Sequence, residues 1–219
     1  ITTINREDYK RAKKMHTPVV RYIHGIGINP ERLSKVDNRS DIRQELRLNK
    51  DAFLCISVGE LNENKNHQVV IKALGELKDP DIHYIICGKG DQLDNLKNLA
   101  KEQGVQNNIH FLGYRMDVLD ICSQSDLFVF PSHREGLPIA PLEAMYCGLP
   151  LITSNIRGLV DYMKEGKTGY LTDPDDVNSF ATKIRKLKSD PQLRVEMGKN
   201  SQKAVLPFLL DNSRKEVLN

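Results

Sequence analysis

Two glutamates separated by seven residues, Glu135 and Glu143, are the side chains of this sequence best placed for chemistry. An apolar stretch typical of a buried strand precedes them, and a helix is predicted to begin near Pro138. Proline suits the first helical position because it has no amide there to leave unpaired. The amides near Gly136 and Leu137 are then free to bind an anion at the helix N-terminus. Two carboxylates beside that site suit a ligand with both phosphates and hydroxyls, as in a nucleotide sugar.

Lys65 offers a positive charge at a comparable place, between a strand predicted over 52–58 and a helix predicted over 68–77. A lysine before a helix N-terminus can pair with phosphate and adds a full charge to the helix dipole. The ordinary alternatives are a solvated turn for Lys65 and a solvated helix face for Glu143. His67 can touch a ligand, but a surface or capping role is the ordinary expectation for it. The chemistry therefore depends on a fold that brings Lys65 and Glu135 together.

Glycines and polar residues follow the other predicted strands as well. The run Gly88-Lys89-Gly90 permits close approach of a ligand to the backbone. It lacks the third glycine of the dinucleotide fingerprint, so a dehydrogenase is the least favoured interpretation. A base can lie against the backbone at Tyr114, whereas Arg115 suits the start of the next helix.

Strand-like and helix-like segments alternate along most of the chain. Strands are predicted over 19–23, 52–58, 82–87, 109–112, 127–130, 149–153 and 169–171, and helices over 68–77, 93–100, 118–122, 138–147, 158–163, 177–187 and 192–204. This alternation predicts an α/β fold, a Rossmann-like doubly wound parallel sheet with helices on both faces. Ligands in such sheets bind outside the carboxyl ends of the strands, at the switch point. The candidate residues all follow strands, which agrees with that rule.

The composition excludes several classes of protein. The 219 residues are 39% hydrophobic and 28% charged, and the net charge of +3 is too weak to indicate a nucleic-acid partner. No apolar run approaches the roughly 20 residues needed to span a bilayer, and no signal peptide is predicted. The four cysteines, Cys55, Cys87, Cys122 and Cys147, are far apart and are expected to be buried reduced thiols. A cytoplasmic location is predicted.

The stretch 1–18 is polar and basic, and it is expected to be a solvated helix or a linker. Attraction of this stretch to the inner face of a membrane is the weaker alternative.

The residues around the two glutamates resemble a known signature. The run from Phe128 to Ser132, then Glu135-Gly136-Leu137-Pro138 and Glu143-Ala144-Met145, resembles the E-x7-E motif of retaining glycosyltransferases of family 4, also called group 1. Further segments match that family in order, namely 25–29, 58–61 with Lys65, 88–90, 111–114, 147–152 and 166–171. The match covers about residue 20 to the C-terminus.

The resemblance implies a GT-B fold, in which two Rossmann-like domains face a cleft. Residues 19–219 would be the C-terminal, nucleotide-sugar-binding domain, and residues 1–18 a linker or the tail of a missing N-terminal acceptor domain. The implied reaction transfers a sugar from a nucleotide-diphosphate-sugar donor with retention, without a cofactor or a required metal. The implied acceptor is a glycan or a lipid-linked sugar in bacterial polysaccharide or glycoconjugate synthesis. The domain alone is expected to be inactive.

The resemblance also implies roles for single residues. Glu135 would contact the donor sugar, Glu143 the ribose, and Lys65 would compensate the charge of the departing diphosphate. Amides around Gly136, Leu137 and Pro138 would face sugar and phosphate, although Pro138 itself has none to donate. The glycines Gly25, Gly27, Gly88 and Gly90, together with Tyr114 and Arg115, would line the donor.

The chain departs from the family pattern at Glu60, where many members carry an arginine beside the diphosphate. Either Glu60 points away, or another cation serves in its place. The candidates for that cation are Arg134, Lys89 and Arg157, and Asp161 is the candidate for the family's acidic residue after Gly158. Two alternatives stay open: another GT-B enzyme such as a nucleotide-sugar epimerase, and a non-catalytic nucleotide-binding module.

Overall fold

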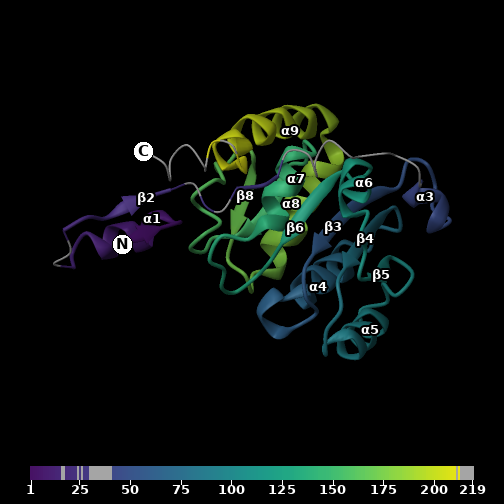
Figure 1. Ribbon diagram of the computed structural model, residues 1–219. Coiled ribbons are helices and arrows are strands. Elements are labelled where there is room, and N and C mark those ends of the chain that lie inside the picture. Colours follow the sequence, from purple (N-terminus) through teal and green to yellow (C-terminus); the bar gives the residue numbers. More distant parts are fainter. Residues whose placement is uncertain (16–17, 24, 26, 30–40, 211, 213–219) are drawn as a thin grey trace.

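The computed structural model describes residues 1–15, 18–23, 25, 27–29, 41–210 and 212. Its centre is a six-stranded sheet with the order β5-β4-β3-β6-β7-β8, in which every neighbouring pair is parallel (Figure 1). The strands are β3 (Phe53–Val58), β4 (Ile82–Cys87), β5 (Ile109–Gly113), β6 (Leu127–Phe130), β7 (Leu151–Ser154) and β8 (Gly169–Thr172). This is the doubly wound order of Rossmann-like folds. The predicted fold class is therefore confirmed.

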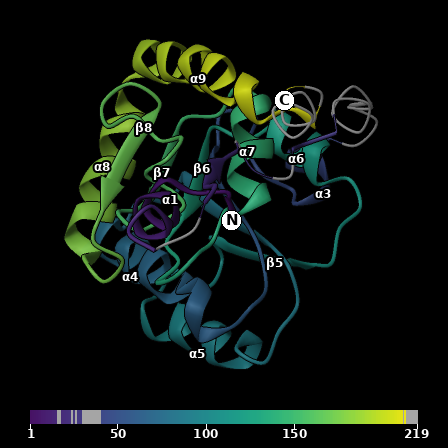
Figure 2. The same ribbon diagram turned by 60° about the vertical axis from the view of Figure 1, so that its left-hand side comes forward.

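Helices cover both faces of this sheet. One face carries α4 (His67–Leu77), α5 (Leu93–Glu102) and α8 (Val177–Ser189), and the other carries α3 (Ile42–Glu45), α6 (Val118–Ser123), α7 (Ile139–Tyr146) and η2 (Leu206–Phe208). The helix α9 (Pro191–Val205) runs across one end of the molecule and packs on α7 and α8 (Figure 2). Side chains of β3 alternate between the two cores: Leu54 and Ile56 face one, and Phe53 and Cys55 face the other.

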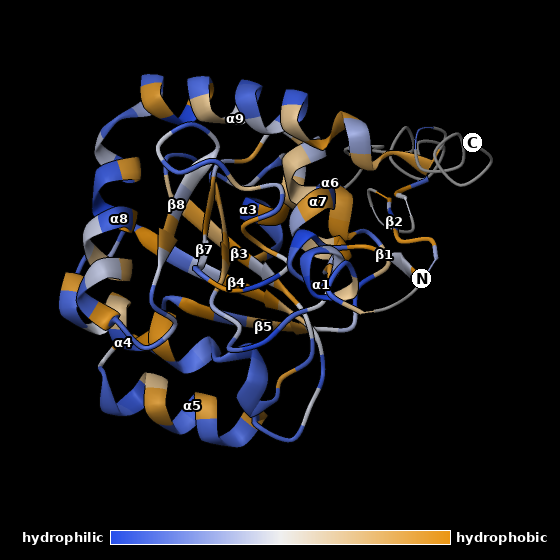
Figure 3. Ribbon diagram, turned by 90° about the vertical axis from the view of Figure 1, so that its left-hand side faces the viewer, coloured by the Kyte–Doolittle hydropathy of each residue, from blue (hydrophilic) through white to orange (hydrophobic). Residues whose placement is uncertain are grey.

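The burial pattern explains why these segments form these elements. Strands of the central sheet carry much hydrophobic colour, whereas α5 is mostly hydrophilic with a narrow apolar side (Figure 3). In α5 the buried side chains are Leu96 and Ala100, four residues apart, which is the spacing of one helix face. The strands are apolar on both faces because helices cover both.

A small N-terminal lobe lies beside the sheet. It consists of β1 (Thr2–Thr3), α1 (Arg6–Ala12) and β2 (Arg21–Tyr22), and its two strands pair in parallel (Figure 1). The lobe is attached to the body by polar contacts, because the Arg6 amide donates to Asp161 at 2.8 Å and Arg157 pairs with Asp8 at 3.0 Å. The helical alternative for the stretch 1–18 is thus the one adopted over residues 6–12.

Some predicted elements differ from the structure. Residues 158–163 were expected to form a helix but form a turn and irregular chain, in which Gly158 has a φ of +85°. A Cβ on Gly158 would lie 2.0 Å from the Gly136 carbonyl oxygen, so this segment is shaped by the loop it packs against. The strand predicted over 19–23 is reduced to two residues, Arg21 and Tyr22.

The cysteines are free thiols. Cys55, Cys87 and Cys122 are buried as expected, whereas Cys147 is partly exposed. Burial raises the pKa of the Cys87 and Cys147 thiols to about 12, so neither is a reactive thiolate at neutral pH. Within the described residues, no helix combines the length and the apolar character that crossing a membrane requires.

Candidate functional site

The topology places the switch point of the sheet between β3 and β6. The two strands are neighbours, but the chain continues from β3 toward β4 and from β6 toward β7, in opposite directions along the sheet. The loops that follow them therefore diverge at the carboxyl edge, where ligands of doubly wound sheets bind. The short helix η1 (Glu63–Lys65) follows β3, and the loop 131–138 follows β6.

Lys65 and Glu135 meet at this switch point. The Lys65 Nζ lies 2.5 Å from Glu135 Oε1, and the two side chains are 19% and 11% exposed. The ammonium also lies 4.9 Å from the centre of the Phe130 ring, which ends β6. Its partial burial excludes the alternative of a solvated turn lysine.

Backbone and amide contacts hold the two loops in register. The Asn62 side chain accepts a hydrogen bond from the Lys65 amide at 3.0 Å and so fixes the turn of η1. Asn64 bridges to the other loop, because its carbonyl accepts from the His133 amide at 2.8 Å and its Nδ2 donates to the Arg134 carbonyl at 3.0 Å. The lysine and the glutamate are thus positioned by their loops as well as by their mutual attraction.

The loop before α7 is open on its outer side. Gly136 is exposed, and a Cβ built on it would meet nothing within 4 Å. Gly136 does not adopt the positive φ that favours glycine, which occurs instead at Gly158. Pro138 is the N-cap of α7 and makes no side-chain cap, so the first amides of the helix have no capping side chain. Pro138 therefore lies one residue before the first helical position expected for it, and the first amides of α7 are left without a side-chain cap.

Glu143 lies inside α7 and is only 6% exposed. This burial excludes the alternative of a solvated helix glutamate. Its neighbours include the half-buried Cys147, whose pKa is raised first by burial and then by the Glu143 carboxylate. A buried carboxylate is unfavourable unless hydrogen bonds or charges compensate it, so Glu143 requires such partners at this position.

The candidate glycines serve close contacts between loops. A Cβ on Gly88 would lie 1.8 Å from the Gly59 carbonyl oxygen, and one on Gly90 would lie 2.2 Å from that of Leu61. These glycines thus let the loop after β4 lie against the loop after β3, an explanation that needs no ligand.

Gly25 and Gly27, which precede the central sheet in the sequence, pack against different residues. A Cβ on Gly25 would lie 2.2 Å from Leu137 Cδ2, so this residue packs on the loop that carries Glu135. Gly27 instead packs on the backbone of Leu210. Gly27 also lines a small cavity with Leu137 and Ile139, so the structure brings both glycines beside the loop that carries Glu135.

Tyr114 and Arg115 lie after the edge strand β5. The Arg115 guanidinium bonds to Asp117 at 2.6 and 2.8 Å and to Glu45 at 2.7 and 3.1 Å, and these carboxylates raise its pKa. The Tyr114 side chain is 70% exposed. The structure does not bring Arg115 to the Lys65–Glu135 pair, and its donors are committed to stabilising the turn into α6.

A network of hydrogen bonds among buried side chains, close to the end of β3, was not predicted. His67 Nδ1 lies 2.9 Å from the Tyr84 hydroxyl, which lies 2.6 Å from Ser57 Oγ. His67 is 3% exposed, so the surface or capping role expected for it is wrong, and burial lowers its pKa to about 4. Its Nε2 lies 3.3 Å from the Glu60 carbonyl oxygen, so this network supports the backbone at the end of β3. The sequence signal was available, since Ser57 and Tyr84 are polar residues within apolar strands.

The comparison with protein families decides the identity. Residues 38–204 match the family described as Glycosyl transferases group 1. The chain belongs to the group 1 glycosyltransferases. A putative glycosyltransferase of Bacillus subtilis, EpsD, is 33% identical over 95% of this chain and 56% of its own length. A UDP-Gal:alpha-D-GlcNAc-diphosphoundecaprenol alpha-1,3-galactosyltransferase of Escherichia coli is 31% identical over 82% of this chain and 48% of its own. The chain spans about half the length of these relatives.

Solved structures show the same fold. HepE from Anabaena, in complex with UDP, has a TM-score of 0.88 at 20% identity and covers 99% of this chain and 62% of its own. WaaG, a glycosyltransferase involved in lipopolysaccharide biosynthesis, has a TM-score of 0.82 at 23% identity and covers 98% and 60%. At these identities the likeness concerns the fold.

Glu60, for which the resemblance implied an arginine, is turned toward a neighbouring amide. Glu60 is exposed and accepts a hydrogen bond from Asn62 Nδ2 at 2.9 Å. Of the cations considered in its place, Arg157 pairs with Asp8 in the N-terminal lobe. Arg134 and Lys89 are both exposed and have no ion pair within the described part of the chain. They are the cations that remain available at this edge of the sheet.

The described residues contain no group of three or more histidine, cysteine or acidic side chains that could hold a metal ion.

Proposed function

We propose that this chain is the donor-binding domain of a retaining GT-B glycosyltransferase, which transfers a sugar from a nucleotide-diphosphate-sugar donor. The observation that carries the proposal is the contact of Lys65 with Glu135 at the switch point, beside the open N-terminus of α7. An ammonium and free backbone amides are the groups that bind a diphosphate. A carboxylate next to them suits the hydroxyls of the attached sugar.

The proposed mechanism uses these groups without a metal. Cleavage of the bond between sugar and diphosphate develops negative charge on the leaving oxygen, and Lys65 with the α7 amides stabilises it. One preorganised donor of this kind typically lowers the barrier by ~3 kcal/mol. Glu135 orients the sugar ring and is not a general acid, and Glu143 binds the ribose. When the donor binds, the Lys65 ammonium turns from Glu135 to the diphosphate, which frees the carboxylate for the sugar.

We also propose that a second, acceptor-binding domain completes the active site. The parallel pair β1–β2 supports this, because parallel strands normally lie inside larger sheets covered on both faces. The lobe also exposes Ile1, Met15 and Val19, at 51%, 60% and 55%. Residues 1–18 and the following strand would then belong with the acceptor domain, and the isolated chain would be inactive.

The biological setting is proposed from the relatives. Two are named for a lipid-linked substrate or for lipopolysaccharide core synthesis, which supports hexosyl transfer to a glycan or lipid-linked sugar in bacterial polysaccharide synthesis. The basic residues of α1 and the turn after it, Arg6, Lys10, Arg11, Lys13 and Lys14, suit peripheral contact with the inner face of a membrane. The protein would then act in the cytoplasm.

A panel of nucleotide sugars, assayed with the full-length protein for release of nucleotide diphosphate and for product, tests the proposal. Transfer with one donor is expected, and its loss in Lys65→Ala and in Glu135→Ala. Interconversion of the donor sugar without transfer would indicate an epimerase. Nucleotide binding without any turnover would indicate a non-catalytic module, which the glutamate at position 60 favours.

A further inference from the structure

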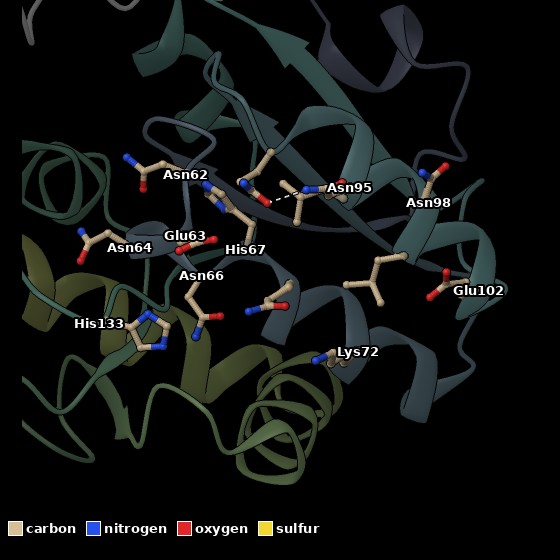
Figure 4. Close-up of a pocket in the computed structure, with 14 residues that line it drawn as sticks. Asn62, Glu63, Asn64, Asn66, His67, Lys72, Asn95, Asn98, Glu102 and His133 are labelled. Atoms are coloured by element: carbon tan, nitrogen blue, oxygen red, sulfur yellow. Dashed lines mark hydrogen bonds between the residues drawn. The ribbon is translucent and has the colours of Figure 1, made fainter.

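A polar groove lies on the outer side of α4 and α5, the helices that cover one face of the sheet. It is separate from the Lys65–Glu135 pair. It has a volume of about 770 Å³ and runs between α4 and α5, with η1 and His133 at one end (Figure 4). In Figure 4, Asn95, Asn98 and Glu102 approach it from α5, and Lys72 from α4. The groove uses neither Lys65 nor Glu135.

Carboxamide side chains dominate the lining. Three come from η1 and its flanks (Asn62, Asn64 and Asn66), and four come from α4, α5 and the residue before α5 (Gln68, Gln92, Asn95 and Asn98). A carboxamide offers two donors and an acceptor in one plane. Adjacent sugar hydroxyls, each of which donates and accepts, match that arrangement.

Several of these amides retain hydrogen-bonding capacity. Asn66 is 2% exposed and donates to the Pro174 carbonyl at 2.7 Å, but its Oδ1 has no partner within the described residues. Asn95 donates one hydrogen bond to Gln92 at 3.0 Å and keeps the second N–H of its amide. Because Asn66 Oδ1 is buried, the hydrogen-bonding capacity open to a ligand is that of exposed amides such as Asn95.

The charged and apolar residues that line the groove limit the kind of ligand it can bind. Glu63 and Glu102 offset Lys72, so no excess of positive charge attracts a phosphate. Apolar contact is limited to Leu96 and Leu99, which provide a small surface for sugar C–H groups and no deep pocket for a peptide side chain. The groove also presents helix faces and no sheet edge to which an extended peptide can add.

We propose that this groove binds a neutral oligosaccharide. This site would be additional to the donor site. Asn64 connects the groove to the loop that carries Glu135, because it lines the groove and bonds to the His133 amide and the Arg134 carbonyl. A glycan in the groove thus lies one loop away from the Lys65–Glu135 pair. The site would hold a growing or acceptor chain near the enzyme between transfers.

Proton–nitrogen NMR of the 219-residue chain tests this proposal, because side-chain amides give their own resonances. Maltohexaose and chitotetraose are titrated separately, and inorganic pyrophosphate and a Gly-Ser decapeptide serve as the anionic and peptide probes. Either oligosaccharide is expected to shift the Asn95 and Asn98 side-chain resonances. Replacement of both by alanine is expected to weaken binding about fivefold or more, since each substitution removes a hydrogen-bonding partner.

The matched control replaces Lys97 and Lys101, two exposed residues of α5 that do not line the groove, and is expected to bind as the unchanged chain does. Thermal unfolding verifies that both double variants fold. The proposal is overturned if neither oligosaccharide shifts groove resonances, if the two double variants bind equally, or if only pyrophosphate or the peptide binds there. UDP is titrated in parallel and read at residues 59–65 and 131–138, so failure of the donor site is distinguished from failure of the groove.

Discussion

Replacement of Lys65 by alanine is the most direct test of the proposed chemistry. The Lys65 side chain is 19% exposed, so its charge is only partly screened by water. A unit charge about 4 Å from a phosphate oxygen contributes about 4 kcal/mol at an effective dielectric constant of about 20. Competition from Glu135, which lies 2.5 Å away in the free chain, reduces the net gain. We therefore expect the barrier to rise by ~3 kcal/mol, which is a roughly hundredfold lower kcat.

The assay is continuous release of nucleotide diphosphate by the full-length enzyme at saturating donor. Lys101→Ala is the matched control, because Lys101 is an exposed lysine of α5 outside the site. Because Lys65→Ala leaves Glu135 without its partner, the thermal unfolding of this variant is followed as well. The value of kcat is then measured well below its unfolding temperature. A kcat of Lys65→Ala within about threefold of the control would refute the assigned role, since it would correspond to less than about 1 kcal/mol.

Further predictions concern the sugar contact, the buried histidine and the close loop contact. Glu135→Ala in the full-length enzyme should abolish transfer while the unfolding transition stays cooperative; retention of transfer would remove Glu135 from the mechanism. The pKa of His67 is about 4 in the fold and about 6.5 when unfolded, so the unfolded chain binds the proton first and stability should fall as pH decreases from about 6.5 to 4. The loss is up to roughly 3 kcal/mol, and denaturant titrations should show it reduced in His67→Gln; an unchanged pH dependence contradicts the assignment. Gly158→Ala places a Cβ 2.0 Å from the Gly136 carbonyl oxygen, at a φ of +85°. This substitution should lower the free energy of unfolding by about 2 kcal/mol or more and weaken donor binding. Gly166→Ala, whose Cβ would meet nothing within 4 Å, should lower the free energy of unfolding less.

The sequence and the structure agree best where the information is local. The strands at the centre of the sheet were predicted within two residues, because their uninterrupted apolar runs require burial on both faces. Residues 158–163 failed because no local pattern shows that Gly158 must pass against the Gly136 carbonyl. His67 failed for a similar reason, since a histidine at a helix start is usually exposed, and only the position of Tyr84 makes a buried partner available.

The sequence by itself determined the class of fold, the family and the loops that carry candidate chemistry, because alternation, glycine positions and the E-x7-E spacing are properties of neighbouring residues. Only the tertiary structure decided which of those residues meet. Lys65 and Glu135 are 70 positions apart and come within 2.5 Å because β3 and β6 are adjacent in the sheet. Arg115 is held by Glu45 and Asp117 instead, since it follows the edge strand β5. Strand order is set by packing across the whole chain, and so the composition of the site is as well.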